Sequence, residues 1–337
     1  MARPPRVVMD PSATYRRLVP VDHLASPVTP SDDVYVIAHM GIARVDVSQW
    51  RLTIDGLVER PFELDYDALT SLPATEVTAV LECFGNPVEP EVATRRVGNV
   101  VWRGVRLAEL LERAVVKPEA RHVCPEGLDS GSFANVYSDR YVKDLPLARA
   151  LEPDVLVAWA MNGEALTAEH GFPARVFVPG YFGTNAVKWL SRITLAAERP
   201  ESLFTTRLYN RRVDGESRPV REIDVHAVIV SPAENATLTI GHHTIEGWAW
   251  GAWPVSAVDV STDGGATWRP ARVTPRGQDH QWQAFTYTWD ASAPGRYALH
   301  ARATDERGRV QPAAGRNRIH IISVTVATGG RDGQRSG

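Results

Sequence analysis

Cysteine is scarce in this sequence, whose 337 residues include only Cys83 and Cys124. A disulfide framework, a zinc site built from several cysteines and a cysteine-held iron–sulfur cluster all need more thiols than this, so the sequence excludes them. The Cys-x-x-Cys-His sequence that attaches haem is also missing, and the sequence predicts no haem. Metal chemistry in this chain would therefore have to use one or two protein thiolates.

Long apolar runs and an excess of one charge are missing as well. The longest conspicuous apolar run, Val155–Met161, is far shorter than the roughly 18 residues that span a bilayer. Because 37 Lys and Arg face 40 Asp and Glu, a basic nucleic-acid-binding surface is disfavoured. Arg16 and Arg17 form a pair, but no apolar stretch follows it as an export signal requires. We expect a cytoplasmic protein, or a periplasmic one if a leader has been removed, with no membrane span and no nucleic-acid partner.

The residue pattern changes near position 200, and the length fits two domains of about 150 residues each. Before this point strand-like and helix-like segments are mixed, whereas short alternating runs take over after residue 224. We therefore predict an α+β fold class, with a mixed α/β domain followed by an all-β sandwich. The predicted parts are an extended N-terminal arm at 1–30, a first domain at 31–205, an Arg-rich linker at 206–223, the sandwich at 224–327 and a disordered tail at 328–337.

Several local patterns predict individual elements of the first domain. Strands are expected at 51–56 and 77–83, and the pair Asn162-Gly163 predicts a two-residue hairpin turn. Apolar residues at helical spacing predict a buried helix face made of Val105, Leu107, Leu110, Leu111 and Ala114. Asp144, followed by Pro146, is a candidate cap for a short helix.

The segment 82–86 places a lone thiol, Cys83, where a predicted strand ends beside a glycine. A thiolate at such a junction suits a nucleophile, a redox sensor or a soft-metal ligand, while a small buried side chain is the structural alternative. A cysteine hydrolase would also need a histidine, and His39, His122 and His170 are available. Cys124 lies in a strand-like run, where we expect it to be packing.

Three cationic residues, His170, Arg175 and Lys188, flank glycine-containing turns. Cations that meet open backbone suit a ligand carrying phosphate. The sequence has no P-loop and no G-x-G-x-x-G, so the usual nucleotide-binding signatures are missing.

Several segments resemble one known family. Leu81-Glu-Cys-Phe-Gly-Asn resembles the cysteine loop of the sulfite oxidase family of molybdenum enzymes. The segment 98–112 is similar to that family's Gly-x-x-x-Trp-x-Gly-Val-x-Leu-x-x-Leu-Leu block. Further similar segments, in family order, are Glu126–Ser130, Tyr141–Ala150, Ala160–Glu164, His170–Arg175 and Val187–Leu190. Residues 245–251 and 258–268 resemble the family's immunoglobulin-like dimerisation domain.

The resemblance implies a molybdopterin-binding catalytic domain at 31–205, in which a pterin dithiolene, oxo ligands and one protein thiolate hold a single molybdenum. Cys83 takes the metal-ligand role, and Tyr141 stands at the position of the family's active-site tyrosine, where its phenol can hydrogen-bond an oxygen. The cofactor-binding positions are His39, Cys83, Asp129, His170, Arg175, Ala186, Val187 and Lys188.

The resemblance also implies a reaction and partners. The expected activity is two-electron oxygen-atom transfer on a small sulfur or nitrogen compound, by a molybdopterin-dependent oxidoreductase without haem. Electrons then pass to or from a separate partner, a cytochrome or another carrier. The immunoglobulin-like domain at 224–327 is expected to hold two copies of the chain together as a homodimer.

Three departures from the family bear on the substrate. The sulfite-oxidising members carry an Arg-Asn-His triplet, whereas this chain has Ile37, Ala38 and His39. Their cysteine loop continues with arginines, whereas residues 86–89 here hold none, and residues 310–320 lack their Trp-Asn-x-Arg-Gly segment. Fewer cations weaken the binding of a dianion, so these departures argue against sulfite. Reduction of an S-oxide or N-oxide is the alternative within the family, and the arginines of 207–221 are candidate replacements.

Two readings lie outside this enzyme class. The segment 261–268 matches the Asp-box hairpin of sialidase-type propellers and suggests glycan binding, but it is present once, whereas propellers repeat it. A non-catalytic interaction protein that kept the fold is the other reading. The joint presence of Cys83, His170, Arg175 and Lys188 argues against that reading.

Overall fold

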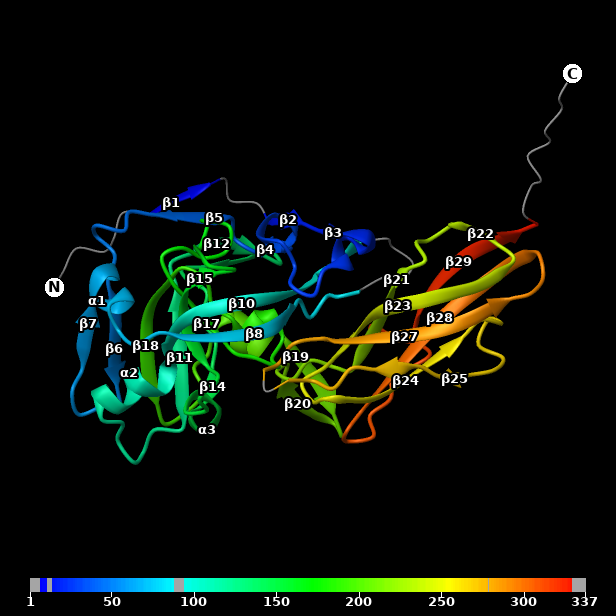
Figure 1. The fold of residues 1–337 in the computed structure, drawn as a ribbon. Coiled ribbons are helices and arrows are strands. Elements are labelled where there is room, and N and C mark those ends of the chain that lie inside the picture. The colour runs from blue at the N-terminus through cyan, green and yellow to red at the C-terminus, as the bar shows by residue number, and fades with distance from the viewer. Residues whose placement is uncertain (1–6, 11–13, 88–93, 278, 329–337) are drawn as a thin grey trace, which may run out of the picture. The chain divides into compact units, whose positions relative to one another are not determined.

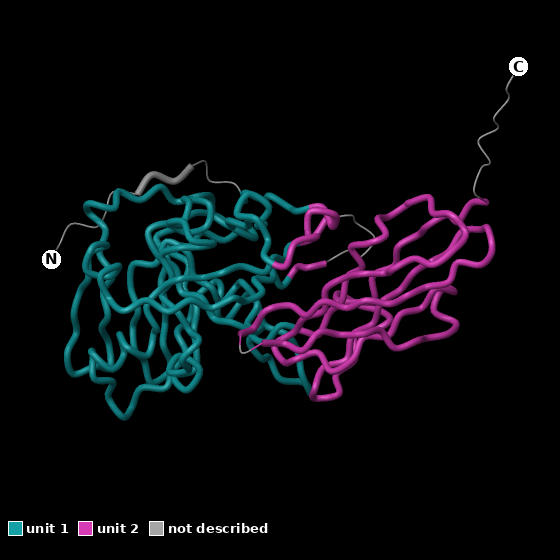
Figure 2. The backbone as a smooth tube through the Cα atoms, in the orientation of Figure 1, with its two compact units in different colours: residues 1–19, 28–84, 96–223 teal, residues 20–27, 85–95, 224–337 magenta. Residues whose placement is uncertain are grey.

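The computed structural model describes residues 7–10, 14–87, 94–277 and 279–328. The chain divides into two compact units (Figure 2), each built from three stretches of sequence. The first unit takes residues 1–19, 28–84 and 96–223, and the second takes 20–27, 85–95 and 224–337. Of the tail predicted at 328–337, only Thr328 lies within the described residues, and the predicted domain boundaries stay predictions.

One of the two large sheets of the first unit is built around a strand with no exposed face. Its members are β8 (Thr75–Glu82), β10 (Val97–Arg106), β15 (Leu156–Met161), β16 (Glu164–Ala165) and β17 (Arg175–Phe177), in the order β16-β15-β10-β8 with β17 also on β15 (Figure 1). Every residue of β15 is buried, which is typical of a central strand covered on both faces. The predicted turn that follows it is confirmed: Asn162 and Gly163 both have positive φ, and β15 pairs with β16 in antiparallel register.

The second large sheet has the order β14-β11-β18-β6-β7. Its strands are β6 (Leu52–Gly56), β7 (Phe62–Leu64), β11 (His122–Gly127), β14 (Leu145–Pro146) and β18 (Leu190–Ala196). The predicted helix is confirmed as α2 (Leu107–Ala114), which buries Leu107, Leu110, Leu111 and Ala114 in the main core. Val105, which the prediction placed on the same helix face, lies on β10 instead. Two shorter helices, α1 (Tyr66–Thr70) and α3 (Leu147–Ala150), complete the α-helical part of the described residues. The fold class is confirmed, with strands forming most of the regular structure.

The capping role expected for Asp144 is wrong. The residue before α3 is Pro146, and no side chain caps the helix. Asp144 instead lies buried and accepts hydrogen bonds from Arg199 at 2.7 Å and Arg221 at 2.9 Å. The two-residue strand β14 separates Asp144 from the helix. The carboxylate pairs instead with Arg199 and Arg221, which come from later in the chain.

Short strands complete the first unit. The predicted arm contains β1 (Val7–Asp10), β2 (Tyr15–Arg17) and β3 (Val19–Pro20), with β1 pairing β5 (Ile42–Val45) and β2 pairing β4 (Val36–Ala38). β12 (Gly131–Phe133) pairs with β13 (Val136–Ser138), whereas β9 (Thr94–Arg95) belongs to the second unit. The Arg-rich segment forms one π-helical turn at Leu203–Arg207 and then the hairpin of β19 (Asn210–Val213) and β20 (Glu216–Pro219).

The second unit is a β-sandwich. One sheet has the order β21-β23-β27-β26, made of β21 (His226–Ser231), β23 (Gly241–Trp250), β27 (Gln283–Ala291) and β26 (Arg272–Val273). The other has the order β22-β29-β28-β24-β25, made of β22 (Thr237–Thr239), β29 (His320–Ala327), β28 (Gly295–Asp305), β24 (Val255–Ser261) and β25 (Arg269–Pro270). Alternate residues of these strands are buried and form a separate core, so the sandwich predicted from the alternating runs is confirmed.

The Asp-box segment forms the connection between β24 and β25. Asp263 accepts hydrogen bonds from the amide and the hydroxyl of Thr267, at 2.9 and 2.6 Å, and from the Ser261 hydroxyl at 2.8 Å. Its carboxylate oxygens therefore hold the turn together, as the structural reading of this segment requires.

A membrane-crossing segment was not expected, and no helix in the described part of the chain has the length and apolar character to cross a membrane.

Candidate functional site

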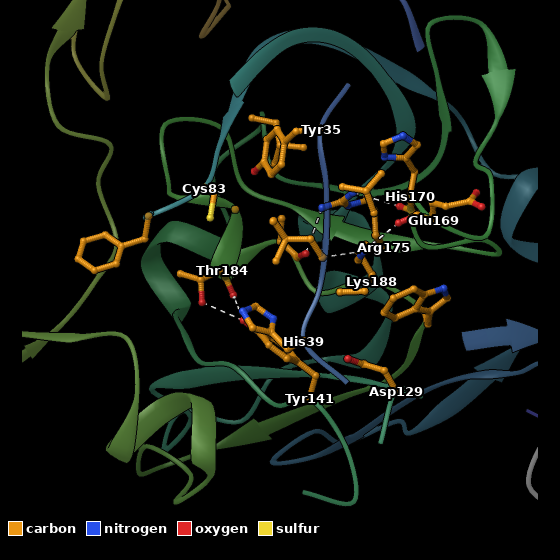
Figure 3. Close-up of a pocket in the computed structure, with 18 of the residues that line it drawn as sticks. Tyr35, His39, Cys83, Asp129, Tyr141, Glu169, His170, Arg175, Thr184 and Lys188 are labelled. Atoms are coloured by element: carbon orange, nitrogen blue, oxygen red, sulfur yellow. Dashed lines mark hydrogen bonds between the residues drawn. The ribbon is translucent and has the colours of Figure 1, made fainter. Parts of the chain in front are cut away.

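A pocket of about 660 Å³ opens in the first unit (Figure 3). Its walls come from β4, the end of β8, the segment after β11, the segments flanking β17, and the turn before β19. The residues that the argument below uses are Tyr35, Ile37, His39, Cys83, Phe84, Asp129, Tyr141, Glu169, His170, Arg175, Thr184, Ala186, Lys188 and Tyr209.

Cys83 follows directly after the last residue of β8, and its sulfur points into the pocket (Figure 3). Its amide donates a hydrogen bond to the Arg96 carbonyl at 2.9 Å, which fixes the end of the strand. The other thiol differs: Cys124 is buried in β11 outside the pocket lining, and burial raises its pKa to about 12. Cys83 is thus the thiol that lines the pocket, whereas Cys124 is buried in a strand, as the sequence predicts for Cys124.

The opposite part of the pocket from Cys83 holds two cations, the buried Arg175 and the half-buried Lys188. Arg175 donates to the carbonyls of His170 at 3.0 Å and Ala186 at 3.2 Å, and its guanidinium lies 4.9 Å from the centre of the Trp102 ring. Lys188 donates to the carbonyls of Ile37 and Glu169, at 3.0 and 2.8 Å. Burial lowers the pKa of Arg175 to about 10, and burial together with the Arg175 charge lowers the pKa of Lys188.

A glycine keeps this cationic end open. Gly171 has φ of +102°, and a Cβ placed on it would stand 2.8 Å from the Lys188 Cβ. Any other residue here would displace the lysine stem, because that position lies well inside contact distance.

The two histidines of the pocket are neutral. Burial lowers the pKa of His39 to about 3, with the Lys188 charge acting in the same direction. The pKa of His170 also falls to about 3, through burial and the Arg175 charge. A neutral imidazole offers one donor and one acceptor, so each ring is suited to hydrogen-bond a polar heterocycle. His122 lies elsewhere, 3.8 Å from Asp144, so the structure brings two of the three candidate histidines to the thiol.

Asp129 supplies the acidic group at the cationic end. It lies two residues beyond β11 and is buried, so burial raises its pKa while the Lys188 charge opposes the rise. A Cβ placed on Gly127 would stand 2.6 Å from a carboxylate oxygen of Asp129. Any larger residue at position 127 would therefore collide with the Asp129 side chain.

Three phenols surround the thiol. Tyr141 hydrogen-bonds the Thr184 carbonyl and hydroxyl, both at 2.8 Å, and the hydroxyl of Tyr209 hydrogen-bonds His39 Nε2. Burial first, and the charge of the Cys83 thiolate as a further cause, raise the pKa of Tyr35, Tyr141 and Tyr209. All three phenols therefore keep their protons at neutral pH and can donate hydrogen bonds.

Tyr209 is the site residue that the sequence analysis missed. Its φ of +56° lies in the left-handed region, which an aromatic residue rarely occupies. The Val220 amide donates to its carbonyl at 2.8 Å, and its ring lies 6.5 Å from Phe204 and 6.4 Å from Phe84, measured between ring centres. The surrounding contacts thus hold a strained backbone that aims the phenol into the pocket.

The structure brings most of the predicted site residues together. Those that line the pocket are His39, Cys83, Asp129, Tyr141, His170, Arg175, Ala186 and Lys188. Val187 is fully buried beside them, and its carbonyl accepts a hydrogen bond from the Val176 amide at 3.0 Å. Their individual roles stay predictions. The pocket also takes in Tyr35, Glu169, Thr184 and Tyr209, which no sequence motif singled out.

The residues fit an anionic cofactor that brings its own metal ligands. Arg175 Nε is buried and has no hydrogen-bond partner within the described residues, so the guanidinium still has a donor to offer. No carboxylate of the described residues lies within ion-pair distance of Arg175 or Lys188, although the charge of Asp129 acts on Lys188, so both cations can still bind an anion. Within the same residues no group of three or more His, Cys, Asp or Glu can hold a metal. A dithiolene cofactor that carries a phosphate would bind these cations and would also bring its own metal ligands.

The arginines of 207–221 do not replace the missing charge inside the pocket. Tyr209 is the residue of this segment that lines it; among the described lining residues none of Arg207, Arg211, Arg212, Arg218 and Arg221 is found. Arg221 is instead bound to Asp144, and Arg218 lies 3.2 Å from Glu216.

Comparison with known proteins gives matches to both units. Residues 39–204 match the family described as oxidoreductase molybdopterin binding domain, and residues 217–326 match the Mo-co oxidoreductase dimerisation domain. Mitochondrial sulfite oxidase of Homo sapiens is 33% identical over 317 residues, covering 85% of this chain and 57% of that protein, so the chain spans little more than half of its length. Sulfite oxidase of Arabidopsis thaliana is 32% identical over 331 residues, covering 86% of this chain and 83% of that protein.

A solved structure agrees with these matches. The sulfane dehydrogenase SoxCD from Paracoccus pantotrophus superimposes with a TM-score of 0.80 at 30% identity, covering 94% of this chain and 85% of that chain.

Proposed function

The chain belongs to the sulfite oxidase family of molybdopterin-dependent oxidoreductases, and from this we propose that it transfers an oxygen atom, with two electrons, to or from a small sulfur or nitrogen compound. The observation that carries the proposal is the pocket itself. One thiol stands among three protonated phenols, and two cations, the buried Arg175 and the half-buried Lys188, line the same cavity.

The cationic end of the pocket, which contains Arg175 and Lys188, is suited to hold the cofactor. Arg175 and Lys188 would bind its phosphate, and the neutral rings of His39 and His170 would hydrogen-bond its pterin. The Cys83 thiolate would be the single protein ligand to molybdenum. When bound, this group supplies the exchange of one oxygen atom and two electrons with the substrate.

The thiol end is suited to bind the substrate. Tyr209 and Tyr141 each present a phenol near Cys83, but the Tyr141 hydroxyl is already engaged with Thr184. Tyr209 hydrogen-bonds the neutral imidazole of His39 in the described part of the chain. In the tautomer that carries its proton on Nε2, His39 donates to the Tyr209 oxygen, which leaves the phenol hydrogen to be donated to a substrate oxygen. We therefore propose that Tyr209 contacts the substrate, beside Tyr141, whose catalytic role stays the prediction made from the family resemblance.

We propose a small sulfur compound as the substrate ahead of a nitrogen compound. The relatives described above are sulfite oxidases, and the structural neighbour is a sulfane dehydrogenase. In the oxidative direction the sulfur gains one oxygen from water, and two protons and two electrons are released. Because electrons must leave the site, we propose a separate one-electron carrier, such as a cytochrome, as the partner, and a homodimer formed through the second unit.

Metal analysis tests the cofactor assignment. Protein produced in a host that makes molybdopterin is expected to contain about one molybdenum per chain, and X-ray absorption counts its sulfur neighbours. Cys83→Ser should remove one sulfur neighbour, whereas Cys124→Ala, which alters the buried thiol, should keep all of them. A folded protein without molybdenum, or an unchanged sulfur count in Cys83→Ser, contradicts the proposal.

Turnover with artificial electron carriers tests the direction. The loaded protein is expected to oxidise a small sulfur compound with two equivalents of ferricyanide consumed per oxygen atom transferred. Reduction of dimethyl sulfoxide or trimethylamine N-oxide by reduced viologen, without any oxidative turnover, would favour the alternative within the family. Turnover in neither direction on any of these compounds would contradict both.

A further inference from the structure

Lysine is rare in this chain, and one of its lysines is buried beside the pocket. Among 37 Lys and Arg residues, only Lys117, Lys143 and Lys188 are lysines. Lys117 is partly exposed near Glu59, and Lys188 belongs to the cationic end of the pocket. Lys143 is 1% exposed and lies outside the pocket lining. Arginine stays charged at any physiological pH, whereas a buried lysine can lose its proton, so Lys143 supplies a charge that pH can remove.

The contacts of Lys143 lead toward the thiol end of the pocket. It follows Tyr141 by two residues, and its amide donates to the Pro125 carbonyl at 3.2 Å, which ties this segment to β11. Its Nζ donates to the Phe204 carbonyl at 2.8 Å and lies 5.7 Å from the centre of the Tyr209 ring. The ammonium group thus contacts two aromatic residues at once, one through its backbone and one through the face of its ring.

Stability alone does not account for a lysine at this position. Within the described residues, no carboxylate lies within ion-pair distance of the Lys143 ammonium group. The adjacent Asp144 has both oxygens engaged, since Oδ1 accepts from Arg199 and Oδ2 from Arg221. A buried charge without an ion pair costs folding free energy, which a neutral side chain of similar length would avoid.

Tyr209 needs support from its surroundings, because its φ of +56° is strained. The Val220 amide donates to its carbonyl at 2.8 Å, and Asn210 Nδ2 donates to the Leu208 carbonyl at 3.0 Å. These bonds hold the backbone, whereas the direction of the ring depends on what the ring touches. A cation within about 6 Å of a ring centre attracts the face of the ring, so charged Lys143 favours the observed direction of the phenol.

The same ammonium group supports a second phenol through Phe204. The Phe204 ring stacks on Tyr141 at 4.2 Å between ring centres. The hydrogen bond from Lys143 holds the carbonyl of Phe204 within the π-helical turn. This bond needs an N–H but no charge, because a neutral amine also donates. Loss of the Lys143 proton therefore leaves Tyr141 supported and weakens only the attraction for Tyr209.

Resting on the proposed function, we propose that Lys143 is a positioning residue: its ammonium form keeps the Tyr209 phenol aimed into the pocket, and loss of its proton slows turnover as pH rises. Tyr209 then delivers its hydrogen bond to the substrate only while Lys143 is charged. The lysine itself touches neither substrate nor cofactor, and its effect passes through the ring it faces.

The charges around Lys143 let the proton leave near neutral pH. Burial lowers the pKa of Lys143 to about 7, while the charge of Asp144 opposes the fall and the charges of Arg199 and Arg221 add to it. The other titratable residues on the elements that contact Lys143 are Tyr141, Tyr209, Arg207 on the π-helical turn, and His122, Cys124 and Glu126 on β11. Of these, His122 is neutral at pH 7 because burial lowers its pKa, and Tyr141, Tyr209 and Cys124 are neutral because burial raises theirs.

NMR of the full chain before molybdenum loading tests the switch itself. Lysine labelled with ¹³C at Cε gives three signals, and the one missing from Lys143→Met and Lys143→Arg belongs to Lys143. We expect it to titrate with a midpoint near pH 7, and the ring signal of Tyr209, identified with Tyr209→Phe, to shift with the same midpoint. In Lys143→Met the Tyr209 signal should not shift there. A Lys143 midpoint above about pH 9, or a Tyr209 signal that does not follow it, overturns the proposal.

Turnover of the molybdenum-loaded chain tests the consequence, and the ratio of variant to parent at each pH cancels the titration of the substrate. For Lys143→Met we expect kcat about tenfold below the parent at pH 6 and equal to it at pH 9, with KM within about twofold at both. Lys143→Arg, which keeps its charge, should exceed the parent at pH 9 by about tenfold. Lys117→Met, which removes the partly exposed lysine, should match the parent throughout.

A double variant separates positioning from a purely structural role. If Lys143 acts through the Tyr209 hydroxyl, adding Lys143→Met to Tyr209→Phe should lower kcat at pH 6 by less than about twofold. A tenfold loss in both backgrounds, or a ratio of Lys143→Met to parent that does not change with pH, contradicts the proposal. Absence of molybdenum or of turnover in the parent would contradict the proposed function and leave the NMR titration standing, so the two failures are distinct.

Discussion

The hydroxyl of Tyr209 is hydrogen-bonded to Nε2 of His39. This hydrogen bond joins the strained backbone at Tyr209, which follows strand β18, to the residue directly after strand β4. The imidazole is neutral, since burial and the Lys188 charge lower its pKa to about 3. The phenol is neutral as well, since burial and the Cys83 thiolate raise its pKa. Both partners of this hydrogen bond are therefore neutral, and the pair adds no formal charge to the pocket beside Cys83.

Replacing the phenol tests this pair. Tyr209→Phe keeps the ring, and with it the stacking on Phe204 and the edge-to-face contact with Phe84, but removes the hydroxyl. We expect kcat/KM of the loaded enzyme to fall about 100-fold, the typical loss for one preorganised donor, with molybdenum content and melting temperature unchanged. Tyr137→Phe, which alters an exposed tyrosine outside the pocket, is the matched control. A loss of less than about threefold would show that Tyr209 does not contact the substrate.

The two thiols should differ in reactivity. Cys83 is partly exposed, whereas Cys124 is 4% exposed and burial raises its pKa to about 12. Molybdenum-free native protein treated with iodoacetamide at pH 8 should take one label, at Cys83, and a second one only after denaturation. Loading with molybdenum should protect Cys83. Peptide mapping by mass spectrometry checks both statements, and native labelling of Cys124 or unprotected Cys83 in the loaded protein would contradict them.

Asp144 should stabilise the first unit. Burial alone would raise its pKa, but hydrogen bonding to Arg199 and the charges of Arg199 and Arg221 lower it. Asp144→Asn leaves two arginines without their carboxylate, and we expect a loss of about 3 kcal/mol of unfolding free energy, at the low end for a buried pair because both arginines keep some solvent contact. Glu76→Gln, at the exposed pair with Arg103, should change it by less than about 1 kcal/mol. Urea unfolding of both variants makes the comparison.

The sequence predicts those parts of the molecule that depend on local pattern. Asn162 and Gly163 form the expected turn because its two left-handed residues must be of such types, and α2 forms because its apolar residues recur at helical spacing. Cys83, Arg175 and Lys188 are found because each lies in a segment whose residues carry a recognisable family pattern, and the structure brings them to one pocket.

The sequence does not predict the parts that depend on long-range contact. Asp144 is placed before a helix by its position in the chain, yet its partners, Arg199 and Arg221, arrive from 55 and 77 residues later. Tyr209 lies in a segment remarkable only for its arginines, and its role follows from a backbone conformation and a hydrogen bond to His39, 170 residues earlier.

The second unit should lose stability in acid through His226. This side chain is fully buried in β21, packs edge-on against Trp250 at 4.8 Å between ring centres, and neither of its ring nitrogens has a hydrogen-bond partner among the described residues. Burial, followed by the charge of Arg95, lowers its pKa well below the usual 6.5, and the pKa of the nearby His320 falls to about 3. Both rings are therefore neutral in the folded chain at pH 5.

The sign of the pH effect follows from proton binding. Below about pH 6.5 the unfolded chain protonates these histidines while the folded chain does not, so stability falls as pH drops from 6.5 toward 3 and is constant above that window. Each histidine contributes at most about 1.4 kcal/mol per pH unit there. His226→Leu should reduce the slope of unfolding free energy against pH, measured by urea unfolding at pH 4.5, 5.5 and 7. His242→Leu, which alters an exposed histidine of β23, should leave the slope as it is. An equal slope in all three proteins would show that the buried ring is protonated without cost.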